Sequence, residues 1–327
     1  MRFKYTNLVF SGGGVLGIAY LGVLEYFYQT GLIYPIVNLA GTSAGAITAC
    51  LTSFNLPFDE LKIILNSLDY RKVAGKDDSP ESPRYFPKVV KDQLSKVFDN
   101  VDCVYRLIKK YGWYSSQYFY DWIRLQIASQ FDSEKKAPPY TFSDFRDASL
   151  HKDNRPFKNL FIIGTDITRS ISTVFSYQTT PNMEVAEAVR ISMSVPLLFE
   201  SIKSSCDINE SDPQTLFVDG GMLYNYPITL FDQDYPIEDT IGVCFKGTPR
   251  ASTINNIVDF ISCSLSCSGR IQNELLHSNP VNIARSICIP TSDVSSFNFD
   301  IAPNDTTHHF LYEQGYRATE IYFSLLS

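Results

Sequence analysis

The first fifty residues contain two successive units in which a short apolar segment leads through small residues into a helical pattern. Leu8–Phe10 is followed by Ser11-Gly12-Gly13-Gly14 and an apolar run over Val15–Thr30, and residues 36–40 lead in the same way into a helical pattern at 44–51. Parallel neighbouring strands need a crossover connection, which is usually a helix. The two units therefore predict an α/β fold with a mostly parallel central sheet and helices on both faces.

The turn of the second unit is the pentapeptide Gly41-Thr42-Ser43-Ala44-Gly45. Small residues around a serine allow the strained turn that exposes its hydroxyl and aims the amides of the next helix at the group it attacks. The G-x-S-x-G pattern alone arises by chance in roughly one chain in ten of this length. The preceding strand and the following helix make it a predicted nucleophile elbow, with Ser43 as nucleophile.

Composition limits the classes of function. The chain has 327 residues, of which 44% are hydrophobic and 19% charged, and it is long enough for one large α/β domain or two smaller ones. Its net charge of -7 and the lack of a basic stripe argue against a nucleic-acid surface. The uncharged runs over 5–24 and 26–58 are broken by glycines and Pro35, so we expect neither a membrane span nor a cleaved signal peptide.

The seven cysteines are odd in number, scattered and mostly set in apolar runs. This usage is typical of reduced thiols, so we expect a reducing, cytoplasmic compartment. A secreted protein that is delivered into a host cell is the alternative, because the host cytoplasm is also reducing. Cys263 and Cys267 have no nearby Cys or His pair that would complete a zinc site, and we expect no metal.

The glycine loop has two interpretations. Gly12, Gly14 and Gly17 satisfy the dinucleotide pattern G-x-G-x-x-G, but a Rossmann site needs an acidic residue about twenty positions on, where this chain has Ser43. Alternatively, the loop amides and the Ala44 amide form an oxyanion hole, because consecutive glycines before a helix leave several N–H groups pointing into one concavity. We favour the oxyanion hole and keep a nicotinamide-dependent oxidoreductase as the alternative.

The base that activates the serine has two candidate types. The order Ser43, Asp219, then His308 or His309 would suit a classical triad, but its elbow normally follows several strands, and the polar residues 304–307 indicate a solvated helix start. Asp219 ends the apolar run of residues 215–218 and precedes two glycines, a place where α/β sheets set catalytic groups. A hairpin turn is the other interpretation of this Asp-Gly pair.

Four blocks in order resemble the patatin-like phospholipases, a family of lipid acyl hydrolases, over roughly residues 7–231. The blocks are the glycine loop over residues 12–17, the elbow over 41–45, the segment 188–196 with Arg190 and Ser192, and Asp219-Gly220-Gly221 followed by Asn225 and Pro227. Each block is modest alone, but four in this order are specific. Leu16 departs from the family pattern, which typically has Arg or Lys there.

The resemblance implies a three-layer fold and a Ser43–Asp219 dyad without histidine. Amides of Gly12, Gly13, Gly14 and Ala44 would form the oxyanion hole, an acyl-serine would form and be hydrolysed, and no metal or organic cofactor would be needed. Gly17, Gly41, Gly45, Gly220 and Gly221 would support the motifs, and Arg190 and Ser192 the site's structure.

We therefore expect a single catalytic domain over residues 1–327. It comprises the motif-bearing core 7–231, an aromatic helical cap at about 87–130, and an extension over 232–327 that completes the sheet and helix layers. The predicted function is a phospholipase A type lipid acyl hydrolase that acts at a membrane or micelle surface, where the aromatic residues of 111–122 would contact lipid. The alternative is a catalytically silent protein that binds lipid or a partner. A protein activator and the oligomeric state stay open.

Overall fold

The computed structural model describes residues 5–73, 101–204, 215–247, 253–255 and 257–326, and its centre is an eight-stranded sheet. Along the sheet the strands lie in the order β10-β9-β1-β2-β4-β8-β7, and β5 also pairs with β4. Their bounds are β1 (Asn7–Phe10), β2 (Asn38–Thr42), β4 (Asn159–Asp166), β5 (Ile171–Ser176), β7 (Ile202–Ser204), β8 (Thr215–Asp219), β9 (Thr240–Lys246) and β10 (Ser286–Pro290). The neighbours from β10 to β4 pair in parallel, and β5, β7 and β8 pair antiparallel. The predicted mostly parallel sheet is confirmed.

A row of polar side chains fixes the register of the four central strands where they begin. Asn38 donates to Asn7 at 2.7 Å, Asn159 donates to Asn38 at 2.8 Å, and Asn7 donates to Thr240 at 3.0 Å. A slip of one residue would turn these side-chain amides to the other face of the sheet. The row therefore aligns the opposite ends of the strands, where the glycine loop and the elbow begin.

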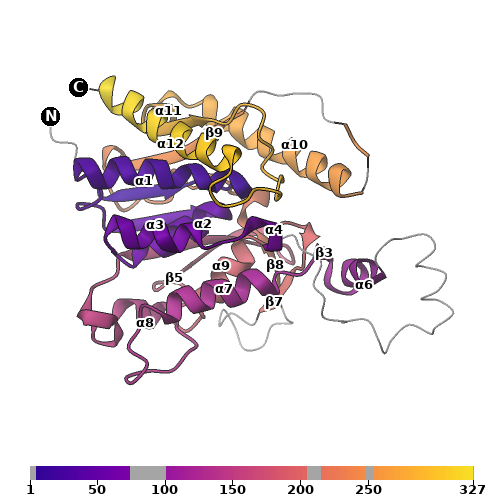
Figure 1. Cartoon of the computed structure of the whole chain (residues 1–327), viewed down its shortest axis with the longest axis horizontal. Coiled ribbons are helices and arrows are strands. Elements are labelled where there is room, and N and C mark those ends of the chain that lie inside the picture. The colour runs from indigo at the N-terminus through magenta and orange to yellow at the C-terminus, as the bar shows by residue number, and fades with distance from the viewer. Residues whose placement is uncertain (1–4, 74–100, 205–214, 248–252, 256, 327) are drawn as a thin grey trace.

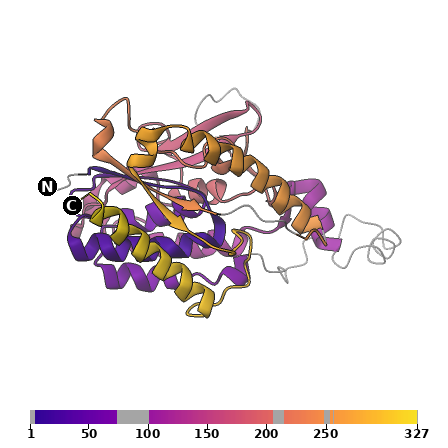
Figure 2. The same ribbon diagram turned by 90° about the horizontal axis from the view of Figure 1, so that it is seen from above.

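Helices cover both faces of the sheet. The main hydrophobic core lies under α1 (Ala19–Thr30), α2 (Ala44–Ser53), α9 (Val185–Ser192) and α12 (Thr306–Ser324), with α3 (Phe58–Asn66) packed against α1 and α2. A smaller core on the other face joins Val9 and Ala40 of the sheet to Tyr226, Ile228 and Phe231. The two termini lie at the same end of the molecule (Figures 1 and 2).

The predicted helix over Val15–Thr30 begins differently in the structure. Gly14–Ile18 forms the 3-10 helix η1, and α1 starts only at Ala19. The tighter turn follows from the loop, since the Leu16 amide bonds back to the Gly13 carbonyl at 3.1 Å. Gly31 ends α1 in the left-handed conformation at φ 78°.

Within the segment predicted as a helical cap, residues 87–100 lie outside the described residues. The rest holds α6 (Val101–Lys110), β3 (Gly112–Tyr114) and α7 (Gln117–Ala128), so a strand interrupts the predicted helical region. β3 pairs in parallel with β6 (Leu197–Phe199). α7 packs against α9 and sends Phe119 and Trp122 into the main core.

The C-terminal third contains α10 (Ile257–His277), α11 (Pro280–Ala284), β10 and α12. β9 and β10 extend the sheet, and α12 packs against α1. Figure 2 shows α10, in orange, running across the molecule toward the side opposite the termini. In the part of the chain that the structure describes, none of the helices combines the length and apolar character needed to cross a membrane.

Candidate active site

The turn after β2 holds Ser43 in an unusual backbone conformation. Its φ of 52° and ψ of -121° lie in a region that L residues rarely adopt, so the turn is strained. A Cβ on Gly45 would lie 2.4 Å from the Phe10 carbonyl oxygen, and one on Gly41 would lie 2.1 Å from the Gly45 carbonyl oxygen. Both glycines are therefore required by the close approach of backbone, and the structure has the strand, strained turn and helix that the sequence predicts.

Strand register brings Asp219 to the level of the elbow. Thr42 of β2 pairs with Ile163 of β4, and the next residue of β4, Gly164, pairs with Asp219 at the end of β8. The Asp219 amide donates to the Ser194 carbonyl at 2.8 Å. The two candidate residues, 176 positions apart in sequence, thus meet at one edge of the sheet.

The carboxyl group of Asp219 lies in a desolvated place, with the residue only 4% exposed. Oδ1 accepts a 2.6 Å hydrogen bond from the Gly221 amide. Burial raises the pKa of Asp219 to about 7, while the nearby Ser43 hydroxyl and the hydrogen bond from the Gly221 amide act in the opposite direction. Desolvation is the larger effect, so this carboxyl group is a stronger base than an aspartate in water.

The Ser43 hydroxyl is close enough to lower the pKa of Asp219, but it makes no hydrogen bond of standard length and angle with the carboxyl group. Within the described residues, Oδ2 is buried and has no hydrogen-bond partner. A buried, unpaired oxygen of this kind calls for an explanation. Here it leaves the carboxyl group with a vacant acceptor, and the Ser43–Asp219 geometry is looser than a closed dyad, as is common before substrate binds.

Three backbone amides around Ser43 are free to donate. Among the described residues, the N–H groups of Gly13, Gly14 and Ala44 make no hydrogen bond. The Gly12 amide differs from the prediction because it donates to the Asn225 carbonyl at 2.9 Å. Gly12 is therefore no oxyanion donor in this geometry, and the predicted set reduces to the other three amides.

The remaining motif glycines sit where backbone segments approach each other. Gly14 has φ 56°, and a Cβ there would lie 2.1 Å from the Ser296 carbonyl oxygen. A Cβ on Gly17 would lie 2.9 Å from the Ala44 Cβ, and one on Gly220 would lie 2.4 Å from the Ile163 carbonyl oxygen. Gly17 thus lets η1 pack against the elbow, and Gly220 lets the chain turn away directly after Asp219.

A cavity of about 790 Å³ contains the candidate residues. Gly12, Gly13, Gly14, Ser43, Ala44, Asp219 and Gly221 all line it. Most of its other walls are apolar and include Leu16, Ile47, Leu68, Val73, Phe119, Met193, Val195, Phe199, Phe245, Phe297 and Phe299. The volume and the apolar walls suit an acyl chain. Leu16 gives this wall an apolar side chain where the family typically places a cation.

The aromatic segment 111–122 contributes little to this cavity. Of its aromatic residues only Phe119 lines it, while Trp122 is buried in the main core. Aromatic walls come instead from Phe199, Phe245 and the segment 291–299, none of which was predicted to belong to the site. No local pattern marks that segment, because its place depends on contacts such as the one from the Val15 amide to the Ser296 carbonyl at 3.1 Å.

Ser192 contacts the elbow directly, whereas the side chain of Arg190 contacts the segment that contains Ser116 and Tyr120. The Ser43 amide donates to Ser192 Oγ at 2.8 Å, and Ser192 Oγ donates to the Ile163 carbonyl at 2.5 Å. The Arg190 guanidinium donates to Ser116 Oγ at 2.7 Å and lies over the Tyr120 ring, 4.7 Å from its centroid.

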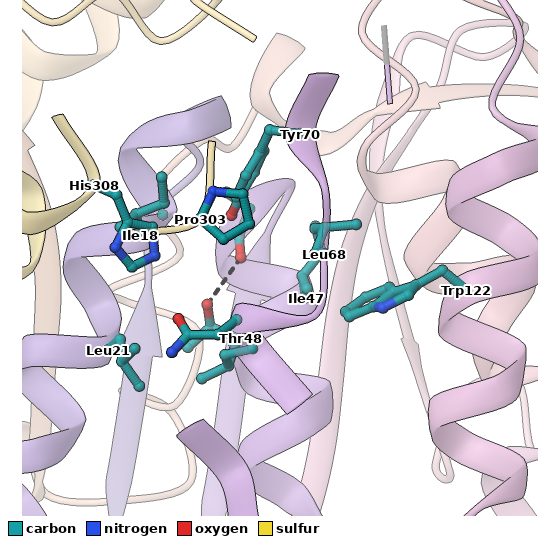
Figure 3. A pocket seen from close by; sticks show the side chains of 13 residues that line it. Ile18, Leu21, Ile47, Thr48, Leu68, Tyr70, Trp122, Pro303 and His308 are labelled. Carbon is teal, nitrogen blue, oxygen red and sulfur yellow. Dashed lines mark hydrogen bonds between the residues drawn. The ribbon is translucent and has the colours of Figure 1, made fainter. Parts of the chain in front are cut away.

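His308 and His309 lie outside the large cavity. His308 lines a separate small cavity of about 20 Å³ beside α2, together with Tyr70, Trp122 and Thr48 (Figure 3). The dashed line in Figure 3 is the 3.1 Å hydrogen bond from Thr48 Oγ1 to the Ala44 carbonyl. The prediction of a solvated helix start holds for exposed His309 and is wrong for His308, which is buried against α2. Burial lowers the pKa of His308.

Comparison with known proteins decides the family. The model of the family described as patatin-like phospholipase matches residues 8–232. The chain belongs to this family. It is 28% identical to uncharacterized protein R571 of Acanthamoeba polyphaga mimivirus, over 97% of this chain and 93% of that protein. It is 27% identical to triacylglycerol lipase 4 of Saccharomyces cerevisiae, over 82% of this chain but 26% of the yeast protein.

Among solved structures, VipD from Legionella pneumophila aligns with a TM-score of 0.61 and 21% identity, over 98% of this chain and 67% of VipD. At this identity the likeness shows the shared patatin-like fold. The family and the lipase-named relatives support lipid hydrolase activity for this chain.

Proposed function

We propose that this protein is a serine lipid acyl hydrolase of phospholipase A type that works through a Ser43–Asp219 dyad. The observation that carries the proposal is the convergence of three features on one cavity: the elbow serine, the buried carboxyl group and three unbonded amides. Histidine takes no part, because neither His308 nor His309 lines that cavity. No organic cofactor or metal enters the proposed reaction.

In the first half-reaction, Ser43 Oγ attacks the ester carbonyl carbon while the hydroxyl proton passes to Asp219. The carbonyl oxygen becomes an oxyanion, which the amides of Gly13, Gly14 and Ala44 would stabilise. Collapse of this intermediate breaks the ester bond, and Asp219 returns the proton to the leaving alcohol. Water then attacks the acyl-serine in the same way and releases the fatty acid.

A pKa of about 7 suits Asp219 to both proton transfers. General bases work best when their pKa lies near the operating pH, because enough of the base is ionised and it binds the proton firmly enough. Desolvation therefore does here what a histidine does in a triad. The cavity walls exclude water from the carboxyl group and also bind the acyl chain.

The substrate class follows from the cavity. A volume of about 790 Å³ with mostly apolar walls accommodates a long acyl chain and part of a glycerol backbone. We assign the substrates to phospholipids or related glycerolipids. The relative named triacylglycerol lipase makes neutral glycerides the class to compare first.

The test is incubation with a mixed lipid extract, followed by mass spectrometry of the released fatty acids and lysolipids. Ser43→Ala and Asp219→Asn should each reduce release to background. Ser268→Ala is the matched control, because Ser268 lines the same cavity but lies on α10 and not at the elbow. Full activity in Ser43→Ala would refute the proposal, and lipid binding without any hydrolysis in the parent would favour the silent lipid-binding alternative.

A further inference from the structure

Helix α10 presents one apolar face to solvent. Phe260, Ile271 and Leu275 are 56%, 62% and 66% exposed, and Ser264 and Cys267 between them are also exposed. Spacings of three and four residues place all five on one side of the helix. We call these five residues the α10 stripe. Single exposed apolar residues are ordinary, whereas apolar side chains aligned on one side of a helix can act together as one contact surface.

The α10 stripe borders the large cavity. Cys267 belongs both to the stripe and to the cavity wall, and Ile254, which lines the cavity just before α10, is 53% exposed. On another side of the helix, Gln272 donates to the Gly221 carbonyl and accepts from the Asn225 amide, both at 2.8 Å. These bonds fix α10 beside the segment that follows Asp219, so the stripe has a defined position at the edge of the site.

The stripe itself carries no charge. The stripe contains no Asp, Glu, Lys or Arg, and the adjacent Arg270 and Glu274 pair with each other at 3.0 Å. An anionic surface would call for unpaired cations, which attract acidic lipids. This face therefore suits a lipid layer whose head groups carry no net charge and whose interior is apolar.

The area of the stripe argues against a second copy of this chain as its partner. Three partly exposed side chains offer roughly 300 Å² of apolar surface, whereas a standard protein interface buries about 800 Å² on each partner. Shallow insertion into a lipid layer has no such threshold, because exposed apolar side chains beside an amphipathic helix gain energy one by one.

We propose that the α10 stripe docks on a neutral or zwitterionic lipid surface and so holds the mouth of the cavity at the source of its substrate. The proposal rests on the proposed function, since it is the lipid substrate that gives the docking its purpose. Phe260, Ile271 and Leu275 insert into the lipid layer, and Ile254 lies where an acyl chain passes from the layer into the cavity. Docking depends on apolar contact and only weakly on salt.

The test measures cosedimentation with phosphatidylcholine vesicles in a Ser43→Ala background, so that no lipid is consumed. The triple variant Phe260→Ser, Ile271→Ser, Leu275→Ser should bind at least about tenfold more weakly, because each side chain loses its transfer into lipid. The control triple Tyr34→Ser, Ile63→Ser, Leu125→Ser removes one aromatic and two aliphatic side chains that are 74%, 71% and 66% exposed on other helices and loops. It should bind as the parent does.

A parent chain that does not bind these vesicles, or a stripe variant that binds them as tightly as the control, would overturn the proposal. So would binding that requires anionic lipid and falls steeply between about 0.1 and about 0.5 M salt. Loss of a dimer in the stripe variant would instead assign the face to a second copy. A soluble short-chain ester separates this proposal from the proposed function, because its hydrolysis needs the catalytic site but no lipid surface. With Ser43 restored, the triple stripe variant should hydrolyse this ester at the parent rate, whether or not it binds vesicles.

Discussion

The backbone amide of Ser43 donates a 2.8 Å hydrogen bond to the hydroxyl of Ser192 at the end of α9. That hydroxyl donates in turn to the Ile163 carbonyl of β4, and two residues later the Ser194 carbonyl accepts the amide of Asp219. One short segment thus holds the backbones of both proposed catalytic residues. It explains physically why the block around residues 188–196 belongs with the elbow and the aspartate.

Ser192→Ala should therefore lower activity as well as stability. The Ser43 amide would lose its only acceptor in the described part of the chain, and a buried unpaired donor costs about 1–3 kcal/mol. Because the elbow loosens, we expect kcat to fall roughly tenfold with little change in KM. Ser194→Ala is the control, since among the described residues the Ser194 hydroxyl bonds only to the Arg190 carbonyl one turn back. Steady-state kinetics in which the two variants behave alike would contradict the positioning role.

The pH dependence of hydrolysis should report on Asp219. Its carboxyl group accepts the serine proton only when ionised, and burial raises its pKa to about 7. We expect kcat to fall about tenfold per unit of pH below 7 and to level off above it. A soluble ester measured from about pH 5 to about pH 9 tests this. A midpoint near the usual aspartate value of about 4 would show that the carboxyl group is not the base.

Stability should change with pH in the opposite direction. Because burial raises the pKa of Asp219 from 3.8 to about 7, the folded protein holds a proton between these two pH values that the unfolded chain has already released. The stabilisation that this bound proton gives the folded state is complete below pH 3.8 and is lost as the pH rises through about 7. The free energy of unfolding should fall by on the order of 4 kcal/mol over this range.

Asp219→Asn removes that titration while keeping an oxygen for the Gly221 amide. Thermal unfolding should show the variant more stable than the parent at about pH 8, with a narrower gap at about pH 5. The same substitution abolishes the proposed activity, which would make this a site where function costs stability. If the variant and the parent melted at the same temperature at both pH values, burial would not destabilise the ionised Asp219 carboxylate.

Two glycine substitutions should have opposite effects on stability. In Gly45→Ala the new Cβ would lie 2.4 Å from a carbonyl oxygen of β1, and backbone on both sides cannot move away without opening the elbow. We expect a loss of more than about 3 kcal/mol. Gly269, in the middle of α10, has no atom within 4 Å of the added Cβ, so Gly269→Ala should gain about 0.5–1 kcal/mol. Chemical denaturation measures both values.

Much of the core could be predicted because its signals are local. The apolar runs that became β1, β2 and β8 are bounded by glycines or polar residues, and the small residues around Ser43 mark a turn that tolerates little else. The expected helix at Val15 was less exact. The hydrogen bond from the Leu16 amide to the Gly13 carbonyl makes the first turn of the expected helix a 3-10 helix. The spacing of apolar residues does not indicate such a backbone bond.

What the sequence could not reveal depends on distant contacts. The short strands β3 and β6 have no alternating pattern and exist because they pair with each other. Gly12 belongs to the loop motif, but its amide donates to the Asn225 carbonyl and is not available to an oxyanion. No residue near Gly12 in sequence indicates this bond. β8 is antiparallel to β4, so the rule for carboxyl ends of parallel strands did not itself apply. Within β4, β8 pairs only with the last three residues, Gly164 to Asp166. Asp219 at the end of β8 therefore lies at the same edge of the sheet as the elbow.

The most direct test of the account is to find which residue forms the covalent intermediate. The parent protein is treated with a fluorophosphonate, digested, and analysed by peptide mass spectrometry alongside Ser43→Ala, Asp219→Asn and Ser268→Ala. The account predicts one adduct on Ser43 in the parent and in Ser268→Ala, no adduct in Ser43→Ala, and strongly slowed labelling in Asp219→Asn. An adduct on any other residue, or unchanged labelling in Asp219→Asn, would contradict the proposed dyad.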